Sequence, residues 1–278
     1  MRLRVTVAAT VVALGIVAGL ATAQQSVPTV TINASPTGAS VAPAGPIAAG
    51  PTRLNVVRPA GFTKGVSAYV ALLVPGVTLE QLQKAIAADD ADEGESALGL
   101  VSIQASVALD PSDKQRAATF TVKPGLTYYV LVEQNVEKGT PPRSFTSFTS
   151  SGDVNGAAAP APAATFTLKG LRFRGPKTLK QTSTVRFQNR DGVAHFALAF
   201  PLRKGTTTAQ FGKAVKSESQ RAFGRIAAGA PYMAQDVISG GDTTNDQELH
   251  FPKKGSYGLV CFIDGHERLG MYKIITVR

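Results

Sequence analysis

The sequence predicts an all-β protein made of two related β-sandwich domains, each with one short inserted helix. Three observations support this fold class. Short strand-like runs with alternating apolar residues recur along the chain, Gly-containing turns separate them, and the order of runs in residues 24–150 repeats in residues 165–278. Because both the type and the order of the runs repeat, we infer that the two halves descend from one ancestral unit.

Four pairs of strand-like runs carry the repeat. In chain order they are residues 29–32 with 165–168, 52–57 with 184–189, 65–72 with 192–198, and 125–132 with 255–262. In this alignment Ala68 stands at the position of His195, and Leu131 stands at the position of Cys261. The first half therefore lacks the residues that could carry chemistry in the second.

A helix is expected after the third run of each half. Thr78 is followed three residues later by Gln81, and Thr207 by Gln210, which is the Thr-x-x-Gln pattern of a capping box. Apolar residues then recur at helical spacing. They are Leu79, Leu82 and Ile86 in the first helix, and Phe211 and Val215 in the second.

Two segments of distinctive composition, residues 1–23 and 151–164, are expected to bound the two domains. Residues 1–23 combine a basic start, an apolar run and a small-x-small cleavage site, which predicts a secretory signal peptide and a secreted protein, periplasmic or extracellular. An uncleaved membrane anchor is the alternative, because the run approaches the roughly 20 residues that a span needs. No other segment is apolar enough, so we expect no membrane span after cleavage. Residues 151–164 are small and Pro-containing, which predicts a linker.

Scarce cysteine and histidine limit the possible chemistry. The chain has 278 residues, one Cys, three His and a formal net charge of +10. A disulfide scaffold is excluded, and the histidines are too few for multinuclear copper clusters or most multi-zinc hydrolase centres. No Lys/Arg run suggests nucleic-acid binding. The basic charge instead favours an anionic surface or an acidic protein partner.

The single Cys belongs to a pattern of metal-binding residue types. Cys261, His266 and Met271 follow one another as C-x4-H-x4-M, and His195 ends an upstream N-x-D-x-x-x-H segment. A thiolate, two imidazoles and a distant thioether are the ligands of a trigonal copper site with a weak axial Met. The thiolate donates strongly to copper, imidazoles suit both oxidation states, and a compact loop resists geometric change on one-electron transfer.

In FQNRDGVAHFAL and GSYGLVCFIDGHERLGM the second half resembles a cupredoxin of the plastocyanin/azurin type. The resemblance covers residues 165–278 and implies a Greek-key β-sandwich with His195, Cys261, His266 and Met271 as copper ligands. It also implies single-electron transfer to a redox protein partner through the edge of the loop histidine. The first half resembles the same fold without the ligands.

Two departures from the family concern the surroundings of the site. Phe196 stands where many members carry an Asn that braces the thiolate loop. Glu267 and Arg268 follow the loop histidine and are expected to make its exposed edge more charged than an apolar electron-transfer patch.

Several alternatives stay open at this point. His250 could complete a zinc site with His195, His266 and Cys261. For cysteine nucleophilic catalysis His195 or His266 could act as the base, but the sequence shows no substrate cleft and no recognisable nucleophile turn. A copper oxidase or nitrite reductase needs more histidines than the chain offers. We therefore predict an exported mononuclear type 1 copper protein that transfers electrons or carries copper and is not an enzyme, the alternative being a metal-free or zinc-bound structural or binding module at the cell surface.

Overall fold

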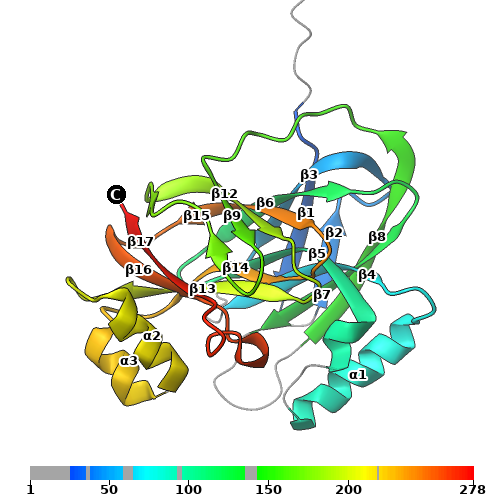
Figure 1. The fold of residues 1–278 in the computed structure, drawn as a ribbon. Coiled ribbons are helices and arrows are strands. Elements are labelled where there is room, and N and C mark those ends of the chain that lie inside the picture. The colour runs from blue at the N-terminus through cyan, green and yellow to red at the C-terminus, as the bar shows by residue number, and fades with distance from the viewer. Residues whose placement is uncertain (1–25, 36–37, 59–64, 93–95, 135–142, 218) are drawn as a thin grey trace, which may run out of the picture.

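The computed structural model describes residues 26–35, 38–58, 65–92, 96–134, 143–217 and 219–278. The predicted signal peptide, residues 1–23, lies outside the described residues. Strands dominate the described part, as the sequence predicts (Figure 1).

Over the residues that the structure describes, the first half contains eight strands, one α-helix and a short 3-10 helix. They are β1 (Thr29–Ser35), β2 (Gly38–Ala42), β3 (Ile47–Val57), β4 (Val66–Leu73), α1 (Leu79–Asp92), η1 (Ser96–Leu100), β5 (Val101–Leu109), β6 (Gln115–Val122), β7 (Thr127–Gln134) and β8 (Arg143–Val154). Strands β8-β7-β4-β5 form one layer, while β1 and β6 flank β3 in the other.

The second half contains nine strands, two α-helices and a second 3-10 helix in its described residues. They are β9 (Ala164–Leu168), β10 (Phe173–Arg174), β11 (Thr178–Leu179), β12 (Thr182–Asn189), β13 (His195–Leu202), α2 (Thr208–Ser217), α3 (Gln220–Ile226), β14 (Tyr232–Ile238), β15 (Thr243–His250), β16 (Gly255–Val260), η2 (Ile263–Gly265) and β17 (Tyr272–Val277). Strands β10-β9-β12-β15 form one layer and β11-β17-β16-β13-β14 the other.

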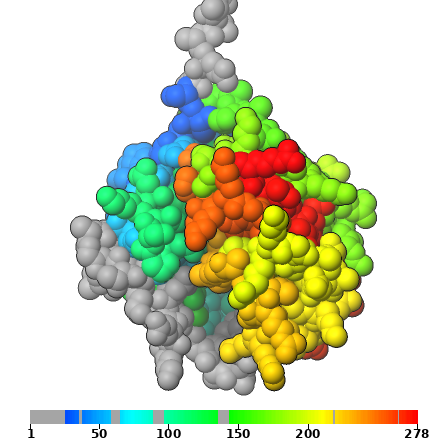
Figure 2. Space-filling view, turned by 90° about the vertical axis from the view of Figure 1, so that its left-hand side faces the viewer, coloured from blue at the N-terminus to red at the C-terminus, as the bar shows by residue number. Residues whose placement is uncertain are grey.

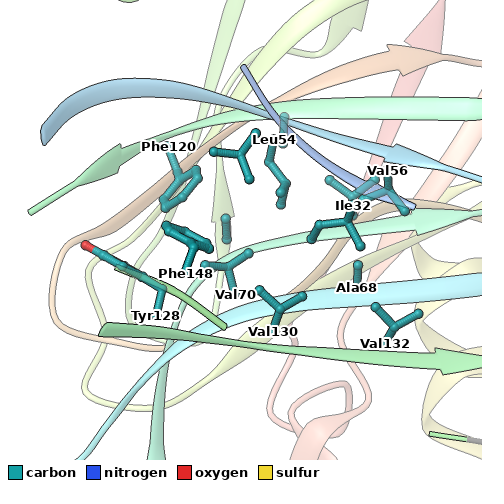
Figure 3. Packing of buried hydrophobic residues seen from close by; sticks show 14 of the residues in the cluster. Ile32, Leu54, Val56, Ala68, Val70, Phe120, Tyr128, Val130, Val132 and Phe148 are labelled. Atoms are coloured by element: carbon teal, nitrogen blue, oxygen red, sulfur yellow. The ribbon is translucent and has the colours of Figure 1, made fainter. Parts of the chain in front are cut away.

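Each half encloses its own apolar core between two layers of strands. In the first half Leu54 and Phe120 face Val70 and Val130 across the interior (Figure 3). The second core is built in the same way, for example from Phe187 on β12 and further apolar residues of β13, β16 and β17. Alternation of buried and half-buried residues along β12 and β13 follows from side chains pointing to opposite faces of a strand.

Two tyrosines fix the correspondence between the halves. The Tyr128 hydroxyl bonds to the backbone of a lysine five residues earlier, and the Tyr257 hydroxyl bonds to a lysine backbone four residues earlier. If Tyr128 is equivalent to Tyr257, then Val132 is the residue equivalent to Cys261. The sequence alignment matches Cys261 with Leu131, one residue earlier. The reason is strand alternation: Val132 points into the core as Cys261 does, whereas Leu131 points out.

The strand pairing shifts the other aligned position too. The register of β13 on β16, compared with that of β4 on β7, makes Val66 the counterpart of His195 in place of Ala68. Both positions in the first half thus carry valine, which binds no metal, so the conclusion that this half lacks the ligands is unchanged.

The two halves are joined by a continuous sheet, which the sequence did not predict. Strand β15 pairs with β6, with Asp246 opposite Thr119 and Gln247 opposite Ala118. Beside this pairing the Gln247 amide donates to the Ser106 carbonyl over 2.7 Å. In Figure 2 the blue-to-green first half lies directly against orange residues of the second half.

The predicted linker and helices need correction in detail. Residues 151–154 extend β8 and Ala164 opens β9, so only residues 155–163 lie between strands. Asn155 ties this connection to the first half, because its backbone N–H donates to the Ala49 carbonyl over 2.8 Å.

Both predicted capping boxes form. Gln81 donates its backbone N–H to the Thr78 hydroxyl, and Gln210 donates in the same way to Thr207, each over 3.2 Å. The second half carries two helices where one was expected, because Ser219 caps a further helix, α3. Among helices of the described part, none has the length and apolar character that crossing a bilayer demands.

Candidate metal centre

Strand pairing brings the predicted site residues to one end of the second sandwich. His195 is the first residue of β13, and Cys261 directly follows β16, its antiparallel neighbour. His266 lies in the loop between β16 and β17, and Met271 directly precedes β17. The paired strands therefore position His195, Cys261 and Met271, and the short loop between β16 and β17 positions His266.

Three donor atoms face one another in the interior. The Nδ1 atoms of His195 and His266 lie 3.2 Å apart, and the Cys261 Sγ lies 4.0 Å from the first and 3.6 Å from the second. A point equidistant from three atoms at these separations lies about 2.1 Å from each, which is the circumradius of the triangle and matches metal–imidazole bond lengths of about 2.0–2.1 Å. The triangle therefore fits one transition-metal ion.

The orientation of His195 is set by a carboxylate. The Asp191 Oδ2 lies 2.9 Å from His195 Nε2. Because a carboxylate only accepts hydrogen bonds, the proton of the His195 ring is on Nε2. The Nδ1 lone pair then points into the triangle formed with the His266 Nδ1 and the Cys261 Sγ. Burial lowers the pKa of His195, although the Asp191 hydrogen bond opposes the shift, so the ring is neutral as metal binding requires.

Asp191 is itself held in place by backbone amides. Gly170 and Leu171 donate to its two carboxylate oxygens over 2.7 and 3.1 Å. Burial raises the pKa of Asp191, but these amides and His195 outweigh it, and the net shift is downward. Asp191 was not among the predicted site residues. Its place four residues before a predicted ligand histidine could have indicated it, because ligand histidines commonly donate their second ring N–H to a carboxylate.

Cys261 is fully buried and receives a backbone amide. The Phe196 N–H points at its Sγ over 3.5 Å. An N–H directed at sulfur stabilises the thiolate form, which is the form that binds metal. The Asn brace of the family is absent, and in its place the Phe196 backbone contacts the sulfur while its ring packs on the core.

Backbone hydrogen bonds close the loop between the two strands. Met271 donates its N–H to the His266 carbonyl over 2.9 Å, and Cys261 donates to the Met271 carbonyl over 3.2 Å. Two glycines, Gly265 and Gly270, adopt φ values of 70° and 98°, which other residues rarely adopt. Met271 is fully buried, and its backbone bonds to both Cys261 and His266. Its role as a fourth ligand stays a prediction.

The outer edge of the loop differs from the expectation in one respect. Glu267 is only 1% exposed, so the prediction of an exposed charge there is wrong. Arg268 is exposed, and its Nε lies 3.4 Å from the Glu267 carboxylate. The apolar side chains Val193 and Leu269 are also exposed. His266 itself is 5% exposed, so only a small part of it reaches the surface.

His250 lies apart from this centre. Its Nδ1 is 2.8 Å from the Thr182 hydroxyl on the neighbouring strand, and the residue is exposed. Within the described ranges, His195, Cys261 and His266 are the one group of three His, Cys, Asp or Glu residues placed to share an ion. The four-ligand zinc site with His250 is therefore not formed.

Comparison with known proteins gives only distant structural likenesses. No protein-family model matches the chain, and no curated protein matches it in sequence. Auracyanin A, a blue copper protein from Chloroflexus aurantiacus, is 24% identical, and the match covers 41% of this chain and 96% of auracyanin A, with a TM-score of 0.28. Auracyanin B is 19% identical, covering 44% and 93%, with a TM-score of 0.27.

A copper nitrite reductase from Nitrosomonas europaea is 11% identical, and the match covers 91% of this chain and 94% of the reductase, with a TM-score of 0.23. Because these TM-scores are low, we infer neither a metal nor an activity from them. The buried His-Cys-His triangle at the end of a β-sandwich is what the sequence resemblance implied, and the second half is cupredoxin-like.

Proposed function

We propose that this chain is an exported type 1 copper protein that binds one copper ion in its second half and transfers single electrons or carries copper. The observation that carries the proposal is the buried triangle of one thiolate and two imidazole donors. His195, Cys261 and His266 would hold the ion, with Met271 as the weak axial ligand. When bound, copper supplies a one-electron redox couple.

Copper is the metal that this donor set fits best. Soft thiolate and imidazole ligands suit copper in both oxidation states, whereas a structural zinc site needs four firm ligands. His250, the imidazole that could complete a zinc set, is bonded to Thr182 on the strand surface. Three donors and a thioether thus favour copper over zinc.

The chain's own groups suit electron transfer because they hold the donors in place. Asp191 fixes His195, the Phe196 amide fixes the thiolate, and the closed loop fixes His266. A donor set that does not move between oxidation states lowers the reorganisation that accompanies electron transfer. The exposed Val193 and Leu269 offer a site for contact with a redox partner near the loop.

The histidine count argues against substrate turnover. Two of the three histidines belong to the triangle, and the third lies on the strand surface. A second, catalytic copper with imidazole ligands would need histidines from another subunit. We therefore propose a protein without its own catalytic activity.

The remaining parts of the proposal concern organisation and partners. We propose that residues 1–23 direct export and are removed, and that residues 24–150 and 165–278 are tandem Greek-key domains, supported by their separate cores. The excess of Lys and Arg over Asp and Glu favours an acidic redox protein or an anionic surface as partner.

Elemental analysis and a visible spectrum of the exported protein test the proposal. We expect one copper per chain, an intense thiolate-to-Cu(II) absorption, and reversible bleaching by one electron. The Cys261→Ser variant should lose the colour, because the charge-transfer donor is gone. Full copper loading without the absorption would contradict the proposed site.

A further inference from the structure

A cavity lies on the outer face of the first half, beneath α1. Its volume is about 260 Å³, and it opens between α1 and strands β4, β5 and β7. Its apolar lining includes Leu82 and Ile86 from α1, Ala71 from β4, Leu131 from β7, and Val237 from β14 of the second half. Sites for small molecules are commonly apolar and found where two domains meet.

In the second half the corresponding place between helix and strands holds an aromatic ring. Leu82 and Phe211 are equivalent, because each lies four residues after the capping threonine of its helix. Phe211 is fully buried against the sheet, and a Cβ on Gly258 would lie 2.3 Å from its ring. The ring therefore rests directly on a glycine of β16.

In the first half both members of that contact are exchanged. Leu82 replaces the phenylalanine, and Tyr129, the residue after Tyr128, replaces the glycine that follows Tyr257. Both line the cavity. On β4, Ala71 contributes only a methyl group to the wall. Although Tyr129 adds a ring on the sheet, Ala71 pairs with Tyr129 as Phe200 pairs with Gly258, so the first half carries one aromatic ring fewer at this place than the second.

The polar groups in the wall are already paired. The Arg143 Nε lies 3.2 Å from the Glu133 carboxylate, so these two charges offset each other. The Tyr69 hydroxyl lies 3.3 Å from the Asp236 carboxylate of the second half. A charged ligand would lose its hydration against this apolar lining and would have to break the Arg143–Glu133 pair to gain a counter-ion there. The walls therefore select an uncharged occupant.

We infer that this cavity is a binding site for a neutral, ring-containing apolar small molecule. The occupant lies beside Tyr129, in the space that the small side chains of Leu82 and Ala71 leave. Neither the proposed copper centre nor electron transfer requires such a site, so it is a separate property of the first half.

Titration with the neutral fluorophore N-phenyl-1-naphthylamine tests the inference on the purified protein carrying both halves. We expect saturable fluorescence enhancement with one site per chain. Leu82→Phe places a ring in the cavity as Phe211 does in the second half, and it should weaken binding at least about tenfold, which corresponds to about 1.4 kcal/mol. The matched control is Leu126→Phe, the same exchange at an exposed position of the first half.

Ala71→Leu provides a second variant that narrows the cavity from the sheet side. Near-ultraviolet circular dichroism selects the variant that keeps the native fold. Loss of binding in Leu82→Phe or Ala71→Leu but not in Leu126→Phe supports the site. Non-saturable enhancement, equal affinity in all three variants, or equal loss in the control overturns it.

Discussion

Replacement of Asp191 by Asn removes a charge from the hydrogen bond that orients His195. The bond is 2.9 Å long, and the imidazole that donates it is fully buried. Asn keeps a carbonyl oxygen that can accept from Nε2, so the ring orientation is preserved while its basicity falls. Loss of such an outer partner usually costs tenfold to a hundredfold in metal affinity, or about 1.4 to 2.8 kcal/mol.

The charge removed also affects the two oxidation states differently. A carboxylate behind an imidazole stabilises Cu(II) more than Cu(I), so its loss should raise the reduction potential. Each tenfold difference between the two affinities corresponds to about 59 mV for one electron. We expect a rise of tens of millivolts in Asp191→Asn, together with weaker Cu(II) binding.

The assay combines competition for Cu(II) with a chelator of known affinity and voltammetry of the loaded protein. Asp242→Asn is the matched control, because Asp242 is an exposed carboxylate 3.5 Å from Arg190 at the same end of the sandwich. It removes the same charge without touching a ligand. Equal affinities and potentials in the two variants would refute the role of Asp191.

Three further predictions follow from burial. Phe211→Ala should lower the free energy of unfolding by about 3–5 kcal/mol and Leu82→Ala by less, because Leu82 already borders a cavity; chemical denaturation measures both. Burial raises the pKa of Asp236, so the folded state binds more protons than the unfolded state above the ordinary Asp pKa, and stability falls as pH rises. The stability of Asp236→Asn relative to wild type should therefore increase from pH 4 to pH 7, and a pH-independent difference would contradict this. Copper should raise the melting temperature of wild type but not of Cys261→Ser, as differential scanning calorimetry will show.

Local chemistry accounts for the parts of the structure that the sequence could predict. The two capping boxes depend on residues three apart, and both form. Alternation along β13 places His195 on the interior face, whereas its approach to Cys261 depends on the antiparallel pairing of β13 with β16. The carboxylate of Asp191 was within reach of the same local reasoning.

Other features depend on contacts that no local pattern encodes. The pairing of β6 with β15 joins segments more than a hundred residues apart through few residues, and neither strand carries a signal for its partner. Glu267 is buried although carboxylates are usually exposed, so its type predicted the opposite. The cavity beneath α1 arises from the sizes of Leu82 and Ala71, which a binary apolar pattern does not distinguish from a filled core.

Copper X-ray absorption on the metal-loaded protein tests the central claim most directly. The triangle of His195, Cys261 and His266 predicts two nitrogen atoms and one sulfur at short range, about 2.1 Å from the ion. The same measurement on Cys261→Ser should lose the sulfur. A wild-type spectrum with only nitrogen and oxygen neighbours would contradict the account.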